Sequence, residues 1–250
     1  MVLVIRKKLL LLTGILVCAC LTVVCCFQGV AAPVSATPRL LPIYGVNTTE
    51  QKLALTFECA WENSDTDRLL SLLGQYGVPA TFFTTGDWCD RYPEDVKRLF
   101  AAGHAIENHS YAHPHPNRLT PDQLVADTQR CDQVITALTG KSPTLYRLPY
   151  GEYNNTVMAT FRDRLPHRVI QWDVDSRDWQ KRTAEEMARD VIAKARPGSI
   201  LLFHNDTENT PEALELILPA LQAQGYTFTL VEDMLLESFT LDHAGRQNPM

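Results

Sequence analysis

Two histidines four residues apart, His109 and His113, have a spacing that lets both imidazoles face one metal ion. Alone, such a pair is more often solvated or used as a cap. Glu58 is a carboxylate in an otherwise apolar stretch, as suits a general base with an adjusted pKa. His204 directly follows the apolar run Leu201–Phe203 and suits a general acid. A metal-activated water, a carboxylate base and a histidine acid together predict hydrolysis of an amide or an ester.

Arg147 and Asp178 are charged residues with two interpretations. They either form a structural ion pair between strand ends or orient the base and the acid. Aromatic residues near the same positions could stack on sugar rings, although core packing is the more common fate of a tryptophan. These aromatic residues are Trp61, Trp88, Tyr111, Tyr150 and Trp179.

The elements that must position these residues alternate between strand and helix. Apolar, β-rich runs predict strands, and helical periodicity with suitable end residues predicts helices. We expect strands at 52–57, 80–85, 104–108, 144–147, 168–174, 199–203 and 227–231. We expect helices at 67–76, 93–102, 121–138, 155–164, 184–195 and 211–224. This order predicts one α/β domain with a parallel sheet, either open and doubly wound or closed as a barrel.

Polar residues follow five of the predicted strands at their carboxyl ends. In both architectures these ends meet on one side of the sheet, where α/β active sites lie. A single polar residue there is usually a turn former or a helix cap, but five successive cases favour a site. The residues are Glu58, Cys59, His109, His113, Arg147, Tyr150, Asp175, Asp178, Trp179 and His204. No glycine-rich phosphate loop follows the first strand, which disfavours nucleotide binding.

Five segments occur in an order that resembles the NodB-type polysaccharide deacetylases, the fourth family of carbohydrate esterases. They are Leu55–Glu58, Gly103–Pro114 with its His-Ser-x-x-His core, Tyr146–Gly151, Trp172–Trp179 and Leu201–Asn205. The resemblance covers about residues 50–236, and the Ala-Trp pair after Cys59 is similar to the sporulation-type branch. It implies an α/β fold, a distorted (β/α) barrel of about seven parallel strands that forms the NodB-homology domain.

The resemblance also implies a function. The family removes N-acetyl groups from chitin-like or peptidoglycan glycans with a divalent metal, which we expect to be zinc, with cobalt or manganese as alternatives. Carried over by position, His109 and His113 would be metal ligands, and Glu58 would stand where the family has its base aspartate. Arg147 would orient that base. The expected partner is a cell-wall polysaccharide, and the protein is expected to be a monomer.

The same resemblance assigns roles on the opposite side of the expected site. Asp178 would tune His204 as the acid. The backbone amide of Tyr150 would help to bind the oxyanion. Trp179 and Leu202 would line the pocket for the acetyl group.

The first motif departs from the family pattern, which reads Thr-Phe-Asp-Asp-Gly with a base aspartate and then a ligand aspartate. Here Glu58 and Cys59 take those places. Glutamate moves the carboxylate by about one methylene, which can cost on the order of 10²-fold in rate. Cys59 either binds zinc as a thiolate or packs as a small hydrophobe. The alternatives are therefore an active deacetylase, an impaired member with a glycan-binding or structural role in the envelope or spore coat, and a hydrolase of another small amide or ester.

The N-terminal region predicts export. Arg6, Lys7 and Lys8 precede nineteen uncharged residues, Leu9–Phe27. This is the pattern of a signal peptide or of a membrane anchor, and both would place the remaining chain outside the cell membrane, anchored or secreted. We expect residues 1–36 to be this leader, 37–50 a linker, 51–240 the deacetylase domain and 241–250 a tail.

Composition excludes several classes of protein. The 250 residues carry 23 basic and 29 acidic side chains, a net charge of −6. Without the three basic residues of the leader the balance is 20 against 29, or −9, which is not the footprint of a nucleic-acid binder. Only Cys59, Cys89 and Cys131 follow the leader. Three cysteines do not make a disulfide framework, although a Cys89–Cys131 pair is compatible with the count.

Overall fold

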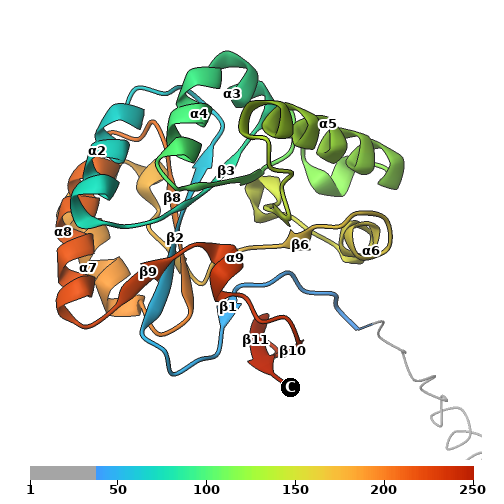
Figure 1. Ribbon diagram of the computed structural model, residues 1–250. Coiled ribbons are helices and arrows are strands. Elements are labelled where there is room, and N and C mark those ends of the chain that lie inside the picture. Colours follow the sequence, from blue (N-terminus) through green and yellow to red (C-terminus); the bar gives the residue numbers. More distant parts are fainter. Residues whose placement is uncertain (1–37) are drawn as a thin grey trace, which may run out of the picture. The chain divides into compact units, whose positions relative to one another are not determined.

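The computed structural model describes residues 38–250, of which Arg39–Met250 form one compact unit (Figure 1). The predicted leader, residues 1–36, lies outside the described residues. Within residues 38–250, no helix is long and apolar enough to cross a membrane.

A mainly parallel sheet forms the centre of this unit. Strand β2 (Lys52–Cys59) pairs in parallel with β8 (Ser199–His204) on one side and with β3 (Thr81–Thr84) on the other. The sheet continues in parallel through β4 (Ala105–Asn108), β5 (Leu145–Tyr146) and β6 (Arg168–Val169). Two short strands, β7 (Val174–Asp175) and β9 (Thr227–Thr229), pair in parallel with β8 and β2. All seven predicted strands are present, but the one expected at 168–174 is divided into β6 and β7.

The sheet curls and is joined across its open side by the segment before β1 (Gly45–Val46). Ile43 donates its backbone N–H to Val169 and accepts one from Gln171, at 2.8 and 2.7 Å. A few residues later, β1 pairs antiparallel with β8. The distorted (β/α) barrel is therefore the architecture that forms, and the open doubly wound sheet is excluded.

Helices surround the strands in Figure 1. The six predicted ones are α2 (Thr66–Tyr76), α4 (Pro93–Ala101), α5 (Pro121–Thr139), α6 (Asn155–Arg164), α7 (Ala184–Lys194) and α8 (Thr210–Ala223). Threonine capping boxes begin α5 and α7, and Gly140 ends α5 in the left-handed conformation that glycine adopts without strain. The prediction missed α3 (Gly86–Arg91), α9 (Val231–Met234) and three 3-10 turns, η1 (Pro116–Arg118), η2 (Pro149–Gly151) and η3 (Asp178–Gln180).

The segments expected as linker and tail belong to the folded unit. Strand β11 (Arg246–Pro249) pairs with β10 (Phe239–Leu241) and with β1. Arg246 is 2% exposed, and its guanidinium contacts Asp173 and the backbone carbonyl of Val46. Such short strands carry too few residues for a period-two pattern to be seen in the sequence.

Strand β2 determines which side chains face the helices and which face the interior of the barrel. Successive strand residues point to opposite faces. Leu53, Leu55, Phe57 and Cys59 belong to the core between sheet and helices. The intervening residues therefore face the other way, and Glu58 is the last of them before the strand ends.

Candidate active site

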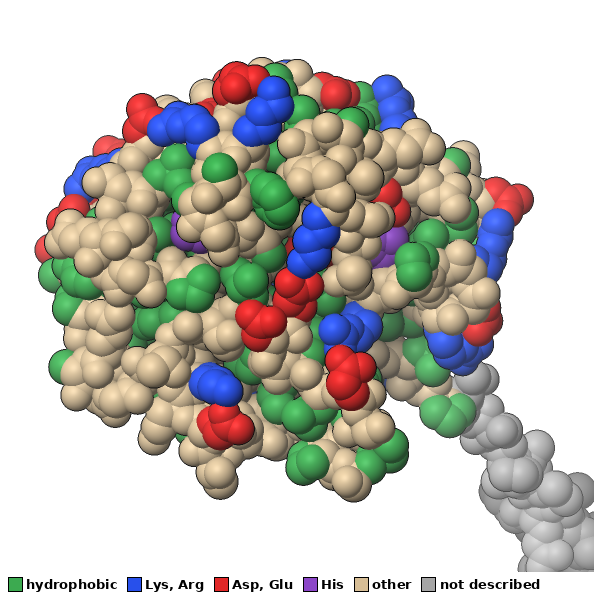
Figure 2. Space-filling model, viewed as in Figure 1, with side chains coloured by type: hydrophobic (Ala, Val, Ile, Leu, Met, Phe, Trp, Pro, Cys, Tyr) green, Lys and Arg blue, Asp and Glu red, His purple; other side chains and the backbone are tan. Residues whose placement is uncertain are grey.

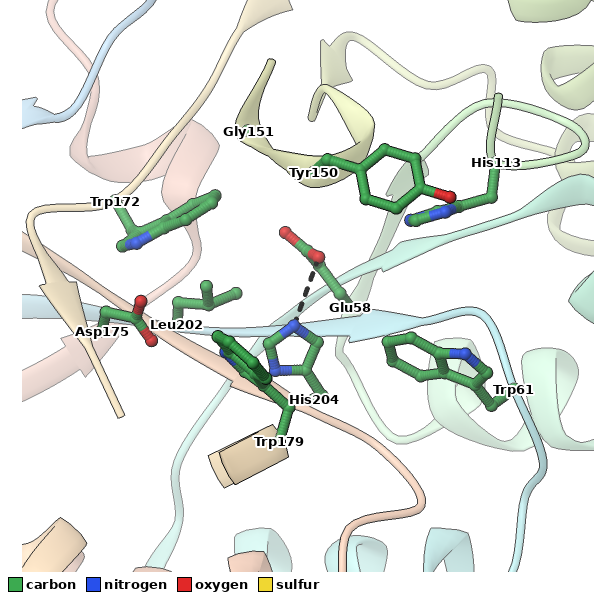
Figure 3. A pocket seen from close by; sticks show the side chains of 10 residues that line it. All are labelled: Glu58, Trp61, His113, Tyr150, Gly151, Trp172, Asp175, Trp179, Leu202 and His204. Carbon is green, nitrogen blue, oxygen red and sulfur yellow. Dashed lines mark ion pairs between the residues drawn. The ribbon is translucent and has the colours of Figure 1, made fainter. Parts of the chain in front are cut away.

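A pocket of about 470 Å³ opens at the carboxyl ends of the strands (Figure 3). Each contributing element ends or turns there: β2, the loop after β4, η2, β7, η3 and β8. The lining residues are Glu58, Trp61, His113, Tyr150, Gly151, Trp172, Asp175, Trp179, Leu202 and His204. Most of the predicted strand-end residues therefore line the pocket. His109, Arg147 and Asp178 lie directly behind it in contact with Glu58 or His204, and Cys59 lies elsewhere.

Glu58 lies at the floor of the pocket between two histidines and an arginine. Its Oε2 is 3.3 Å from Nε2 of His109 and 3.5 Å from Nε2 of His204, and its Oε1 is 3.8 Å from the guanidinium of Arg147. Burial by itself would raise the pKa of this carboxyl, but His109 and His204 hold it well below its usual range. Glu58 is therefore an anion throughout the neutral range.

Arg147 is fully buried below Glu58. Its guanidinium donates to Thr56 Oγ1 at 2.8 Å and to the carbonyl of Gln171 at 3.2 Å. It also lies 4.2 Å from the ring centre of Phe83. Burial lowers the pKa of Arg147 to about 10, so it stays cationic. This position suits a residue that orients Glu58. Arg147 itself has no direct access to a ligand in the pocket.

His204 is joined to Asp178 by two hydrogen bonds. Its Nδ1 and its backbone N–H are each 2.7 Å from a carboxylate oxygen of Asp178. Thr210 and the backbone N–H of Trp179 also donate to this carboxylate, at 2.9 and 3.0 Å. Burial would lower the pKa of His204, but Asp178 and Glu58 together raise it to about 10. His204 therefore carries a proton at neutral pH.

His109 and His113 have the properties of metal ligands. Nδ1 of His109 donates to the carbonyl of Arg147 at 2.9 Å, which leaves Nε2 with a lone pair and no hydrogen-bond partner. The two imidazole rings lie 4.9 Å apart. Burial and the nearby His109 lower the pKa of His113 to about 4, so it is neutral. The pair fits a divalent metal ion by its chemistry.

Cys59 does not face these histidines. It is 1% exposed within the core between sheet and helices, and burial raises the pKa of its thiol well above the usual value. Of the two interpretations of Cys59, the structure favours packing as a small hydrophobe. Across residues 38–250, no three His, Cys, Asp or Glu side chains form a ready group of metal ligands. Cys59, Cys89 and Cys131 are all free thiols, so no Cys89–Cys131 disulfide forms.

Aromatic side chains form the walls and rim of the pocket. Trp61, Tyr150 and Trp179 are 47%, 55% and 58% exposed. The ring of Trp61 lies 5.7 Å from that of His204. Tyr150 has a positive φ of 60°, a strained backbone that often occurs at functional sites. Leu202, at 2% exposure, lies on the floor beside His204.

Some residues behave differently from their sequence-based interpretation. Trp88, considered for sugar stacking, is completely buried in the core, and Tyr111 does not line the pocket. Trp172 and Gly151 do line it but were not singled out. Both lie in segments that the sequence analysis identified as motifs, but the sequence does not show which side chains of a motif face the pocket.

A barrel with a carboxylate, a protonated histidine and a histidine pair at its strand ends has the features of a hydrolase site. The family model that matches the chain is polysaccharide deacetylase, over residues 45–165. A peptidoglycan-N-acetylmuramic acid deacetylase of Bacillus subtilis is 34% identical over 76% of this chain and 74% of its own length. A peptidoglycan-N-acetylglucosamine deacetylase of Bacillus cereus is 31% identical over 84% of this chain and 78% of its own length.

Among solved structures, a CE4 family pseudoenzyme from Bacillus anthracis is similar, with a TM-score of 0.75 and 30% identity over 79% of this chain and 69% of that one. A mutant of that pseudoenzyme is described as having restored enzymatic activity. The chain belongs to the polysaccharide deacetylase family, the NodB-type fourth family of carbohydrate esterases.

Proposed function

We propose that this protein is an exported hydrolase that removes N-acetyl groups from N-acetylglucosamine-containing cell-wall glycan. One observation carries the proposal: a continuous chain of charged contacts, Asp178–His204–Glu58, lies at the base of a pocket with aromatic walls. These contacts place the anionic carboxylate of Glu58 3.5 Å from the protonated imidazole of His204, so a proton acceptor and a proton donor lie side by side. The deacetylase names of the relatives support the same chemistry.

Glu58 acts as the base in this proposal. It takes a proton from water, and the resulting hydroxide adds to the carbonyl carbon of the acetyl group. Arg147 stays in place behind Glu58 and fixes the direction of its carboxylate. The backbone N–H of Tyr150, at the turn with positive φ, is a candidate donor to the oxyanion that then forms.

His204 acts as the acid. Its Nε2 faces the pocket while Nδ1 is bound to Asp178. The proton on Nε2 passes to the sugar nitrogen as the C–N bond breaks, which releases acetate and leaves a free amine. Trp179 and Leu202 border the space beside His204 where the acetyl methyl group would lie.

A divalent metal, for which His109 and His113 are the proposed ligands, would polarise the acetyl carbonyl and lower the pKa of the attacking water. We propose zinc, with cobalt or manganese as alternatives. The neutral state of His113 and the free lone pair on His109 Nε2 support this assignment. We further propose residues 1–36 as an export leader or anchor, which puts a monomeric domain on the outer side of the membrane with access to the cell wall.

A second candidate is a catalytically impaired member that binds glycan or has a structural role. Two observations favour it. The contacts with His109 and His204 depress the pKa of Glu58, which makes it a weak base, and Cys59 offers no ligand to the pocket. The similarity to a CE4 family pseudoenzyme points in the same direction.

Acetate release separates the two candidates. Purified full-length protein would be incubated with an N-acetylglucosamine tetramer or with peptidoglycan, with and without added Zn²⁺, Co²⁺ or Mn²⁺. The deacetylase proposal predicts acetate and an equal amount of free amine. Glycan binding without any acetate would support the impaired member instead.

A further inference from the structure

Three carboxylates lie around the base of the pocket, Glu58, Asp175 and Asp178, and two of them have ion-pair partners. Asp178 is paired with His204, and Glu58 lies between His204 and Arg147. Asp175 is the remaining carboxylate, and no ion pair joins it to any other residue of the described chain.

No unpaired cation stands in the wall beside Asp175, because His204 is already paired with Asp178 and Glu58. Among the ten lining residues there is no lysine or arginine. The guanidinium of Arg177, two residues further along the chain, is bound to Asp190 at 3.2 Å. His115, which stacks on Tyr150, is paired with Glu152 at 3.2 Å. A negatively charged ligand would therefore meet a carboxylate and find no free cation in this wall.

Figure 3 shows where this charge lies. Asp175 stands beside Trp172 and Leu202, whereas His113 and Tyr150 lie on the opposite side of Glu58. Charge held at the histidine pair would act on that opposite side. Asp175 therefore controls the charge at its own wall of the pocket.

The rest of the lining suits an uncharged sugar. Trp61, Tyr150, Trp172 and Trp179 present rings to the pocket. The C–H faces of a pyranose ring stack on such aromatic surfaces without any need for a charge partner. Like charges placed close together across an interface disfavour binding when solvent is excluded.

We propose that Asp175 is a specificity-determining residue that rejects sugars with a free carboxylate. The preferred substrate is then a run of N-acetylglucosamine units, and muramic acid units with an unsubstituted lactyl group are disfavoured. This inference rests on the proposed function, because it names the substrate class of the same site. It concerns ligand choice, which can be measured apart from catalysis.

Asp175→Asn is the variant that isolates the charge. The carboxylate of Asp175 accepts the backbone N–H of Arg177 at 2.8 Å and so holds a turn in which Arg177 has a φ of 55°. An asparagine oxygen accepts the same hydrogen bond, so the turn is kept and only the charge is lost. Asp122→Asn, in the exposed first turn of α5, removes an equal charge away from the pocket and serves as the matched control.

The experiment measures binding of the full-length protein to two probes by calorimetry, with acetate release followed in parallel. One probe is the N-acetylglucosamine tetramer, and the other is peptide-free glycan with free lactyl carboxylates. At low salt, wild type and Asp122→Asn are each expected to bind the tetramer about tenfold more tightly than the glycan with free lactyl carboxylates, a difference of about 1.4 kcal/mol. Raising the salt concentration should narrow this preference. Asp175→Asn should reduce this preference to about threefold or less, because the probe with free lactyl carboxylates then binds more tightly.

Equal binding of the two probes by wild type, or an unchanged preference in Asp175→Asn, would overturn the inference and leave the proposed function in place. Tetramer binding with the expected preference but no acetate would support the inference and contradict the proposed activity. If neither probe binds and no acetate appears, both fail together.

Discussion

The protonation of His204 depends on its neighbours. Its pKa of about 10 results from Asp178 and Glu58, which outweigh the effect of burial. Because this value exceeds the ordinary 6.5, the stabilisation from the protonated pair is complete below pH 6.5. It declines as the pH rises from there and is lost once the pH passes about 10. The acid of the proposed reaction is thus available throughout the neutral range.

Asp178→Asn should weaken this protonation. Without the carboxylate, His204 loses its strongest cation-stabilising partner, so the alkaline limb of the pH profile of kcat/KM should move down by at least about one pH unit. The turnover itself should fall by about 10²-fold or more. Asp163→Asn, on the exposed surface of α6, is the control and should leave the profile unchanged. An unshifted alkaline limb in Asp178→Asn would show that His204 is not the titrating acid.

Strand β2 explains why adjacent residues have different fates. Its alternation sends Glu58 into the pocket and Cys59 into the core. The sequence identified both as strand-end residues. It did not show that β2 extends through Cys59, because a polar residue at the end of an apolar run is equally compatible with a turn. Side-chain direction at a strand end is set by the hydrogen bonds to the neighbouring chain. Here the backbone N–H of Thr85 donates to the carbonyl of Cys59, and Cys59 is in register with Thr84 of β3.

Substitutions at Cys59 test this orientation. Cys59→Asp buries a carboxylate among apolar side chains, so the free energy of unfolding should fall by about 3 kcal/mol or more in urea denaturation. Cys59→Ala should cost only about 1 kcal/mol and leave the affinity for Zn²⁺ unchanged. A Cys59→Asp protein as stable as Cys59→Ala, or a loss of zinc affinity in Cys59→Ala, would place this side chain in the pocket.

The whole folded unit depends on a contact between its two ends. Arg246 of β11 holds the segment around β1 and the partly buried Asp173, which also accepts the backbone N–H of Ile200 in β8 at 3.0 Å. The strand order places β1 directly beside β8, and β11 lies on the other side of β1. Closure of the barrel on this side therefore uses residues that the sequence pattern assigned to linker and tail.

Arg246→Ala should therefore destabilise the protein strongly. It leaves the carboxylate of Asp173, which is 12% exposed, without its principal cation, and breaking a largely buried pair costs about 3–5 kcal/mol. Arg196→Ala is the matched control, because Arg196 contacts the same carboxylate at 3.4 Å from an exposed position and should cost about 1 kcal/mol or less. Urea denaturation measures both. Equal effects of the two substitutions would show that the contact between Arg246 and Asp173 does not hold the barrel together.

Periodicity was sufficient for the long elements of the molecule. The six predicted helices and the central strands lie within a few residues of their expected bounds, since each buries one regular apolar face. The short strands β1, β10 and β11 were missed because they are held by long-range contacts, Arg246 among them. Figure 2 shows acidic and basic side chains interspersed on one face of the molecule.

The direct test of the account compares acetate release by wild type and Glu58→Gln. Glutamine keeps the size of the side chain but cannot accept the proton of the attacking water. We predict acetate release from the N-acetylglucosamine tetramer by wild type in the presence of a divalent metal, and a fall of at least about 10²-fold in Glu58→Gln with tetramer binding retained. Equal rates in the two proteins, or no acetate from a folded, glycan-binding wild type, would contradict the assignment of Glu58 as the base of an active deacetylase.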